Sequence, residues 1–268
     1  MTRRQRVTDG APILFEEATR ARLRDVAGRA LVIWPVGATE QHGPHLPTGT
    51  DAMHAEWVAR EAAVRAARDG LATVIAPTLR IGSSQHHLPF GGTMSLPTET
   101  YYRAVRAGVE SLVTDGFRRV VVVNGHGGNH EIIQLVVRDL ALEIPDVHLG
   151  AGSWWTIAWD ALVAAGAADI GRFPGHAGRF ETSLMLAMRP DLVVHPLPHR
   201  DDPGTTDPRR FGADLRAERS GSWQAIDGYG DSPDLADAEL GRRWLDVSAD
   251  AVAASYLAFQ RAAGGPVG

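Results

Sequence analysis

The segment RVVVVNGHGGN, at Arg119–Asn129, decides the fold class of this chain. Four consecutive valines predict a strand that is covered on both faces, because such strands have continuous apolar runs and not alternation. The glycines that follow predict a turn with close backbone approach or positive φ. Two further apolar runs, Leu31–Val36 and Ala72–Ala76, predict strands of the same kind.

Longer amphipathic segments alternate with these strands. The helices that they predict are Asp51–Asp69, Thr98–Thr114, Asn129–Leu142 and about Leu235–Ala262, and His148–Gly150 begins a short fourth strand. Strands that alternate with helices indicate an α/β fold, a single domain over residues 1–268 with a central, mainly parallel sheet flanked by helices. We expect Thr98 and Asn129 to cap their helices, and Trp154, Trp155 and Trp159 to pack in the core.

Composition excludes several classes of function. The 268 residues are 44% hydrophobic and 22% charged, as in an ordinary globular protein. A net charge of −5 argues against a nucleic-acid or anionic membrane partner. Cysteine and lysine are absent, which removes thiolate chemistry, Schiff bases and a P-loop lysine. No apolar run approaches the ~20 residues of a membrane helix, and the basic start leads into no signal peptide, so we expect a cytoplasmic protein.

The first candidate site is EQHGPH at Glu40–His45, followed by Asp51. It comes directly after a predicted strand, and ligands in parallel α/β sheets bind beyond the carboxyl ends of the strands. Glu40 and His42 can bind two different metal ions, or only one of them faces a site. Asp51 opens a helix, whose dipole keeps the carboxylate ionised, and an ionised Asp can bridge two cations. The alternative is that Asp51 only caps this helix. Three residues of metal-ligand type within one loop favour the site.

The second candidate is the turn that contains His126. A histidine within a glycine turn suits a metal better than a phosphate. The alternative is a glycine-rich phosphate loop, but the spacing does not fit the Gly-x-Gly-x-x-Gly pattern of dinucleotide-binding folds.

Two more segments carry candidate residues. His176 precedes a predicted helix and Glu181 lies near its start, so this segment can supply a general base and a further ligand, or merely a favourable acid at a helix start. The long connection 80–96 contains Ser84, His86 and His87, and long ordered connections are often functional. Adjacent histidines do not easily share one metal, so we expect them to form a substrate-facing wall or to be exposed.

Four motifs together resemble those of the creatininase (creatinine amidohydrolase) family. They are PVGATEQHGPHLPTGTD at Pro35–Asp51, HHLPFGGTMSL at His86–Leu96, VVNGHGGN at Val122–Asn129 and HAGRFETSLML at His176–Leu186. The resemblance implies a compact α/β domain that assembles as a homohexamer. It also implies a two-metal centre, with zinc, manganese or iron, that hydrolyses amide C–N bonds.

The resemblance assigns roles residue by residue. It implies that Glu40, His42, Asp51 and His126 are metal ligands, with Asp51 as the bridge, and that His176 is catalytic and delivers a proton to the leaving nitrogen. Creatininase itself has a further Glu ligand where this chain has Gly128. Glu181 is the best substitute, and Glu131 is the competitor, although it lies on a helix that should lead away from the strand ends.

The predicted substrate-binding residues are Ser84, His87, Gly127 and Arg179. Creatininase closes on creatinine with a Tyr and a Trp, whose places here are taken by Gly127 and Arg172, so creatinine is not the expected substrate. The same glycine loop occurs in related deformylases and in the peptidase that trims the mycofactocin precursor. Arg179 suits a substrate carboxylate, or else makes a surface ion pair.

We therefore expect a metal-dependent amidohydrolase that acts on a cyclic amide, a formamide or a short peptide, with two divalent metal ions per chain, zinc first. A peptidase that trims a small precursor peptide is the alternative within this class. The alternative from another class is a non-hydrolytic nucleotide-binding α/β protein that uses Gly125–Gly128 as an anion cradle.

Overall fold

Five parallel strands form the central sheet, in the order β1-β3-β2-β4-β5. Their bounds are β1 Ile13–Leu14, β2 Leu31–Val36, β3 Thr73–Ile75, β4 Arg119–Asn124 and β5 His148–Ser153. This computed structural model describes residues 11–170, 173–200, 210–211, 215–216 and 219–264. The predicted α/β class, with a central parallel sheet between helices, is confirmed.

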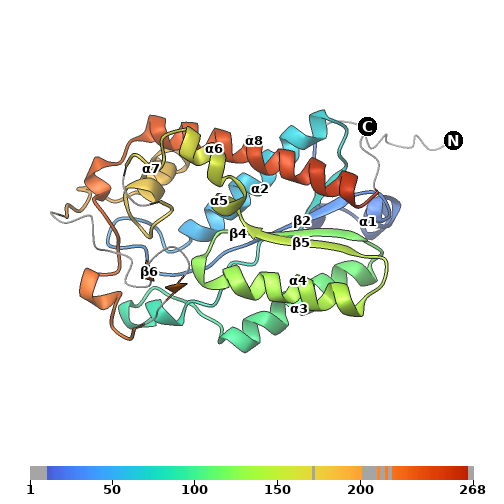
Figure 1. Ribbon diagram of the computed structural model, residues 1–268, viewed down its shortest axis with the longest axis horizontal. Coiled ribbons are helices and arrows are strands. Elements are labelled where there is room, and N and C mark those ends of the chain that lie inside the picture. Colours follow the sequence, from blue (N-terminus) through green and yellow to red (C-terminus); the bar gives the residue numbers. More distant parts are fainter. Residues whose placement is uncertain (1–10, 171–172, 201–209, 212–214, 217–218, 265–268) are drawn as a thin grey trace.

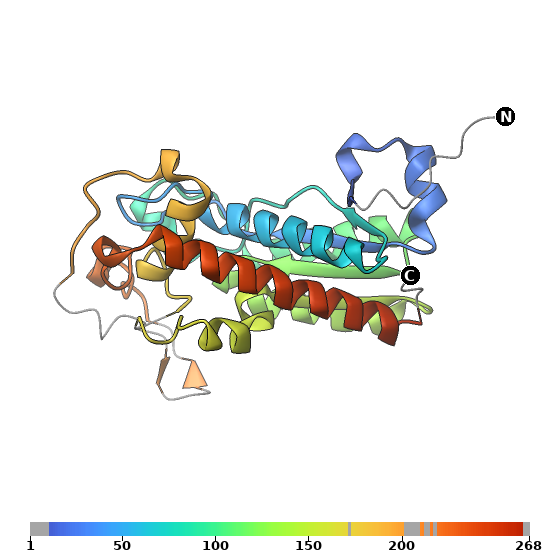
Figure 2. The ribbon, with the colours of Figure 1, turned by 90° about the horizontal axis from the view of Figure 1, so that it is seen from above.

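Helices cover both faces of the sheet (Figures 1 and 2). The cluster on one face contains residues from α2, α5, α6, α7 and α8, and the cluster on the other contains residues from α1, α3 and α4. Their bounds are α1 Arg20–Ala27, α2 Thr50–Arg68, α3 Thr98–Thr114, α4 His130–Glu143, α5 Trp154–Ile157, α6 Trp159–Ala164, α7 Arg179–Met188 and α8 Ala238–Ala262.

The valines of β4 pack against the helices on both faces of the sheet. Val121 and Val123 pack with α2 and α8, whereas Val120 and Val122 pack with α3 and α4. Successive side chains of a strand point to opposite faces, so a strand between two helical layers has to be apolar at every position.

The two central strands place the site. Val36, at the end of β2, pairs with Asn124, at the end of β4, so the chain leaves both strands at one edge of the sheet. From there β2 leads to β3 on one side, and β4 leads to β5 on the other. This point between β2 and β4, where the strand order diverges, is where open α/β sheets bind ligands.

Most predicted helices and strands, the last helix included, lie within a few residues of those observed. The helix α8 begins at Ala238, slightly after the predicted start near Leu235, since Pro233–Leu235 forms a separate 3-10 turn. Asp237 ends the preceding loop by accepting hydrogen bonds from the backbone N–H groups of Glu239 and Leu240, both at 2.8 Å. Such a side-chain cap defines a helix start more sharply than the apolar pattern does.

Two predicted caps and one predicted core residue are wrong. Neither α3 nor α4 has a side-chain cap. Asn129 instead accepts from the backbone N–H of Ser83 at 2.9 Å and donates to the carbonyl oxygen of Gly37 at 3.0 Å, so it ties three loops together. Trp159 is 39% exposed although it stacks on Phe173, whereas Trp154 is buried as predicted.

Several short elements were not predicted. They are β1, α1, α5, α6 and an antiparallel pair of two-residue strands, β6 Arg210–Phe211 and β7 Leu215–Arg216. The strand β5 also continues to Ser153, beyond its predicted end. Across the described ranges, no helix combines the length and the apolar character that a membrane crossing requires.

Candidate metal centre

The carboxyl ends of β2 and β4 bring the predicted ligands together. Glu40 and His42 lie in the loop after β2, Asp51 lies in the first turn of α2, and His126 follows β4. All four residues are at most 3% exposed. Burying so many charged groups is unfavourable unless they are paired with one another or with an ion.

Asp51 faces a different histidine with each of its carboxylate oxygens. Its Oδ1 lies 3.1 Å from Nε2 of His42, and its Oδ2 lies 2.9 Å from Nδ1 of His126. This is the orientation expected of a carboxylate that bridges two cations, each of which has one of these histidines as a ligand.

The other ring nitrogen of each histidine contacts a backbone carbonyl. Nδ1 of His42 is 3.1 Å from the carbonyl oxygen of Glu40, and Nε2 of His126 is 3.1 Å from that of Ser83. A carbonyl oxygen only accepts, so these nitrogens carry the protons. The nitrogens that face Asp51 are left as the ligand atoms, and this orientation by a backbone carbonyl is typical of metal-binding histidines.

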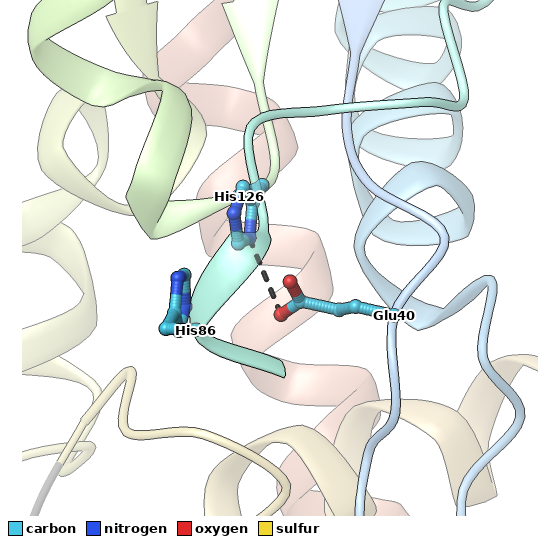
Figure 3. Close-up of side chains that lie close together, drawn as sticks. All are labelled: Glu40, His86 and His126. Atoms are coloured by element: carbon cyan, nitrogen blue, oxygen red, sulfur yellow. Dashed lines mark ion pairs between the residues drawn. The ribbon is translucent and has the colours of Figure 1, made fainter. Parts of the chain in front are cut away.

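Glu40 occupies the space beside His126. Its Oε1 lies 3.3 Å from Nδ1 of His126, and the hydroxyl of Ser84 donates a hydrogen bond to its Oε2. Figure 3 shows the carboxylate of Glu40 opposite the imidazoles of His86 and His126. Glu40, His42 and Asp51 also form one of the groups of ligand atoms compact enough to hold a cation.

Glu181 approaches the centre from α7. Its Oε2 is 3.8 Å from Nε2 of His42 and accepts a hydrogen bond from the backbone N–H of Ala177 at 2.6 Å. Ala177 has a φ of 47°, a left-handed conformation that is unfavourable for a residue with a side chain and that is held here beside the site. Glu131, the competing acid, is exposed on α4.

The glycine loop explains why an acid from elsewhere is needed. A Cβ at Gly128 would lie 2.3 Å from the carbonyl oxygen of Ser83 and 2.5 Å from Nε2 of His126, so no side chain fits this backbone. A Cβ at Gly125 would lie 2.2 Å from the carbonyl oxygen of Asp51. Contacts within the protein therefore require glycine at positions 125 and 128, whether or not the loop binds an anion.

His176 and His87 form a second wall of the site, and Gln41 holds both. The side-chain amide nitrogen of Gln41 lies 2.8 Å from Nδ1 of His87 and 3.1 Å from Nε2 of His176. The two imidazoles are stacked at 4.3 Å between centroids. The ring of Trp223 lies 4.9 Å from that of His87 and 5.0 Å from that of His176. Neither Gln41 nor Trp223 was predicted as a site residue, because no local pattern marks either of them.

The predicted substrate-binding residues have different surroundings. Ser84 and His87 are buried, with the Ser84 hydroxyl engaged by Glu40. A Cβ at Gly127 would meet no atom of the described residues within 4 Å, so they leave space open there. Arg179 begins α7, and Arg172 lies outside the described residues. Their contacts with substrate stay predictions.

Electrostatics show how strongly the site attracts positive charge. Burial lowers the pKa of His42, but the charges of Asp51, Glu181 and Glu40 outweigh it and raise this pKa to about 10. Burial also lowers the pKa of His126, but the charges of Glu40 and Asp51 outweigh this effect and raise the pKa to about 10. Burial raises the pKa of Glu181 to about 8. The bound protons supply charge that a divalent cation would supply when bound.

These pKa values predict proton release on metal loading. Near pH 7 we expect about three protons per chain to leave His42, His126 and Glu181 as divalent metal binds, because the ligand atoms must be deprotonated. Since all three pKa values are raised, protons compete more strongly as pH falls, and apparent metal affinity should rise with pH up to about 10. Calorimetric titration of the apoprotein in buffers of different ionisation enthalpy measures the release. Metal binding without proton release would show that these histidines are not ligands.

Comparison with known proteins decides the family. Residues 16–256 match the Creatininase family, described as creatinine amidohydrolase. The chain belongs to the creatininase family. This creatininase-family protein is 33% identical over 189 residues to the mycofactocin precursor peptide peptidase of Mycobacterium ulcerans (strain Agy99), which covers 68% of each chain. It is 36% identical over 186 residues to the creatinine amidohydrolase of Pseudomonas putida, which covers 63% of this chain and 68% of the relative.

Solved structures agree with this assignment. A crystal structure of creatinine amidohydrolase (creatininase) superposes with a TM-score of 0.73 at 29% sequence identity, covering 91% of this chain and 96% of that one. The protein is therefore a metal-dependent hydrolase that acts on C–N bonds, and its His and Glu clusters fit a metal. The predicted family and reaction class are confirmed.

Proposed function

We propose that this enzyme uses two divalent cations to cleave an amide C–N bond of a short, carboxylate-bearing peptide. Zinc is the first candidate for these cations, and manganese and iron are the alternatives. The observation that carries the proposal is the orientation of Asp51, with one oxygen toward His42 and one toward His126. Imidazole and carboxylate ligands suit zinc and iron well, and the absence of cysteine leaves only nitrogen and oxygen donors.

The ligands divide into two sets that share Asp51. Glu40 and His126 would hold one cation, and His42 and Glu181 would hold the other. Divalent cations bound there would polarise the amide carbonyl and make the attacking water more acidic. The contribution of the chain is to fix the ligand orientations through the carbonyls of Glu40 and Ser83 and the backbone N–H of Ala177.

His176 is the proposed proton carrier. Its Nε2 lies 3.1 Å from both the side-chain amide nitrogen and the backbone carbonyl oxygen of Gln41. The two amide hydrogens of Gln41 point to Nδ1 of His87 and to the carbonyl oxygen of Gly228, both at 2.8 Å. Nε2 of His176 therefore donates to the carbonyl oxygen of Gln41, and its Nδ1 faces Glu40 at 3.6 Å. Burial, followed by the charge of His42, holds the pKa of His176 well below its usual range. The neutral ring can therefore accept a proton at Nδ1 from the attacking water and, once charged, readily donate it to the leaving nitrogen.

His87 and Trp223 complete the proposed pocket. Because Gln41 donates to Nδ1 of His87, the Nε2–H of His87 points toward Oε1 of Glu40, at 3.6 Å. Trp223 is 5% exposed and packs on both His87 and His176. Its apolar ring excludes water from the side of the proton carrier, which strengthens electrostatic interactions inside the site.

Three observations support a peptide with a free carboxylate as the substrate class. Gly127 stands where creatininase has a Tyr that closes on creatinine, and a Cβ at Gly127 would meet no atom of the described residues within 4 Å, which favours a substrate other than creatinine. The guanidinium of Arg179, two residues before Glu181, has its buried Nε without a hydrogen-bond partner among the described residues. A relative at 33% identity is a precursor peptide peptidase. We therefore infer that Arg179 binds the carboxylate of the substrate.

Arg179→Gln tests this substrate class. We expect KM for a peptide with a free carboxylate to rise by about 10–100-fold, because hydrogen bonds between charged groups contribute about 1.5–3 kcal/mol. The same peptide with an amidated carboxyl end should show little change. The matched control is Arg189→Gln, at the other end of α7, whose guanidinium pairs with Asp191 at 2.7 Å. Equal KM changes for both peptides would contradict the anchor.

Metal content tests the centre itself. Elemental analysis of the purified full chain should find nearly two equivalents of metal, and a chelator should abolish hydrolysis in a screen of short peptides, formamides and cyclic amides. The nucleotide-binding alternative predicts bound nucleotide and little metal. The hexamer implied by the family stays a prediction, which sedimentation velocity would check.

A further inference from the structure

His86 lies beside the proposed metal centre but has no role in it so far. It belongs to the 3-10 helix Gln85–Phe90, in the long connection between β3 and α3. Its ring is parallel to that of His126, at 8° and 5.8 Å between centroids, and packs on His87 at 4.3 Å. His86 is only half-buried, whereas Glu40, His87 and His126 are almost fully buried.

Three side chains converge at this place. One ligand atom each from Glu40, His86 and His126 lies within 4.8 Å of the other two (Figure 3). Ligand atoms at about 2.0–2.2 Å from one zinc ion are at most about 4.4 Å apart, so a small rotation of a half-exposed ring closes the difference.

We propose that His86 is a further ligand of the cation held by Glu40 and His126, on the solvent side of that cation. This inference rests on the proposed two-cation function. It assigns the two adjacent histidines to different tasks, since His87 faces Glu40 together with His176, in a separate group of ligand atoms. The sequence predicts a substrate-facing wall formed by both histidines, or their exposure. On this inference, only His87 would belong to such a wall.

The chemistry of the ligand predicts a metal preference. With His86 the ligands of this cation are two imidazoles and the carboxylates of Glu40 and Asp51. Imidazole suits zinc, whereas manganese favours oxygen ligands. His86 should therefore raise the affinity of this one site for zinc more than its affinity for manganese.

Two variants separate ligation from packing. His86→Ala removes the ring, and His86→Phe keeps a ring that can stack on His126 and His87 but has no ligand nitrogen. We expect both variants to retain one tightly bound zinc and to bind the second at least about tenfold more weakly, because even partners outside the direct ligands cost about 10–100-fold in metal affinity. The affinity of the same site for manganese should change less.

The measurement is competition between the full-length apoprotein and a chromophoric chelator, with zinc and then manganese, and the visible spectrum of the Co(II)-loaded protein. In His86→Ala, added imidazole should restore the wild-type Co(II) spectrum, because position 86 is half-exposed and free imidazole can reach it from the solvent. The control is His148→Ala, which removes an exposed histidine from the start of β5 and should change neither readout.

The outcomes distinguish this inference from the proposed function. If both His86 variants bind two zinc ions as tightly as the wild type and keep its Co(II) spectrum, His86 is not a ligand, while the two-cation centre stands. If His86→Phe behaves like the wild type and only His86→Ala loses zinc, the ring acts by packing and the inference is overturned. A wild-type protein without metal would overturn the two-cation function as well.

Discussion

We expect Asp51→Ala to lose both metal equivalents and to reduce amide hydrolysis by more than about 10³-fold. One carboxylate faces a ring nitrogen of both His42 and His126, so on the proposed two-cation function its removal would deprive both cations of a ligand and of negative charge. Loss of even one group that stabilises the oxyanion costs about 10²–10³ in turnover, so loss of both cations costs more. Elemental analysis and steady-state rates of the purified variant measure the two effects.

The comparison variant for Asp51 is Glu181→Gln. Of the two histidines that Asp51 faces, Glu181 is paired with His42, at 3.8 Å, so its amide variant should lose mainly one equivalent. Loss of both ions from Glu181→Gln, together with retention of both by Asp51→Ala, would make Glu181 the bridge. Full metal content and activity in Asp51→Ala would remove Asp51 from the centre. Circular dichroism of each variant shows whether the fold is kept.

The second large effect is expected for His176→Ala. This variant should keep its metal content and lose about 10²–10⁴-fold in turnover for an amide, whose nitrogen leaves poorly without a proton. An activated ester with a good leaving group needs no such proton and should be hydrolysed with a much smaller loss. The ratio of the two rates, measured on the same preparation, isolates proton transfer from general damage to the site.

Equal losses on amide and ester would assign His176 a different role. His176 belongs to a possible ligand group with His42 and Glu181, so loss of metal from His176→Ala would indicate that His176 binds a metal ion. Unchanged metal content with equal losses would indicate that its ring shapes the pocket beside Trp223. His148→Ala, far from these residues in the sequence, is the control for a lost imidazole.

Much of the fold could be predicted from short-range pattern. The valine run of β4 and the apolar run of β2 identify strands buried on both faces, and the segments between them have helical periodicity. Position along the chain then places Glu40 and His126 at one sheet edge, because parallel strands all end on the same side. The short α5 and α6 have too few residues for such a pattern, and β1 has only two.

The rest of the site depends on contacts between distant segments. Gln41 lies in a predicted motif, yet its link to His87 and His176 requires both histidines to be positioned first. Trp223 comes from an irregular segment without periodicity. Asn129 precedes a helix as a cap residue does, but a buried backbone N–H of Ser83 competes for its side chain. Local propensity does not reveal such a competitor.

The origin of Glu181 on α7 affects how the chain matures. Gln41 and His176 are 135 positions apart, and α7 packs on α8, the last helix, which packs on α2. A nascent chain therefore presents Glu40, Asp51 and His126 before the helix that carries Glu181 has a surface to dock on. Closing so long a loop has an entropic cost, and a cation that binds only the closed form offsets it by mass action. On the proposed function, the cation held by His42 and Glu181 would bind late in biosynthesis and would then join α7 to the loop that follows β2.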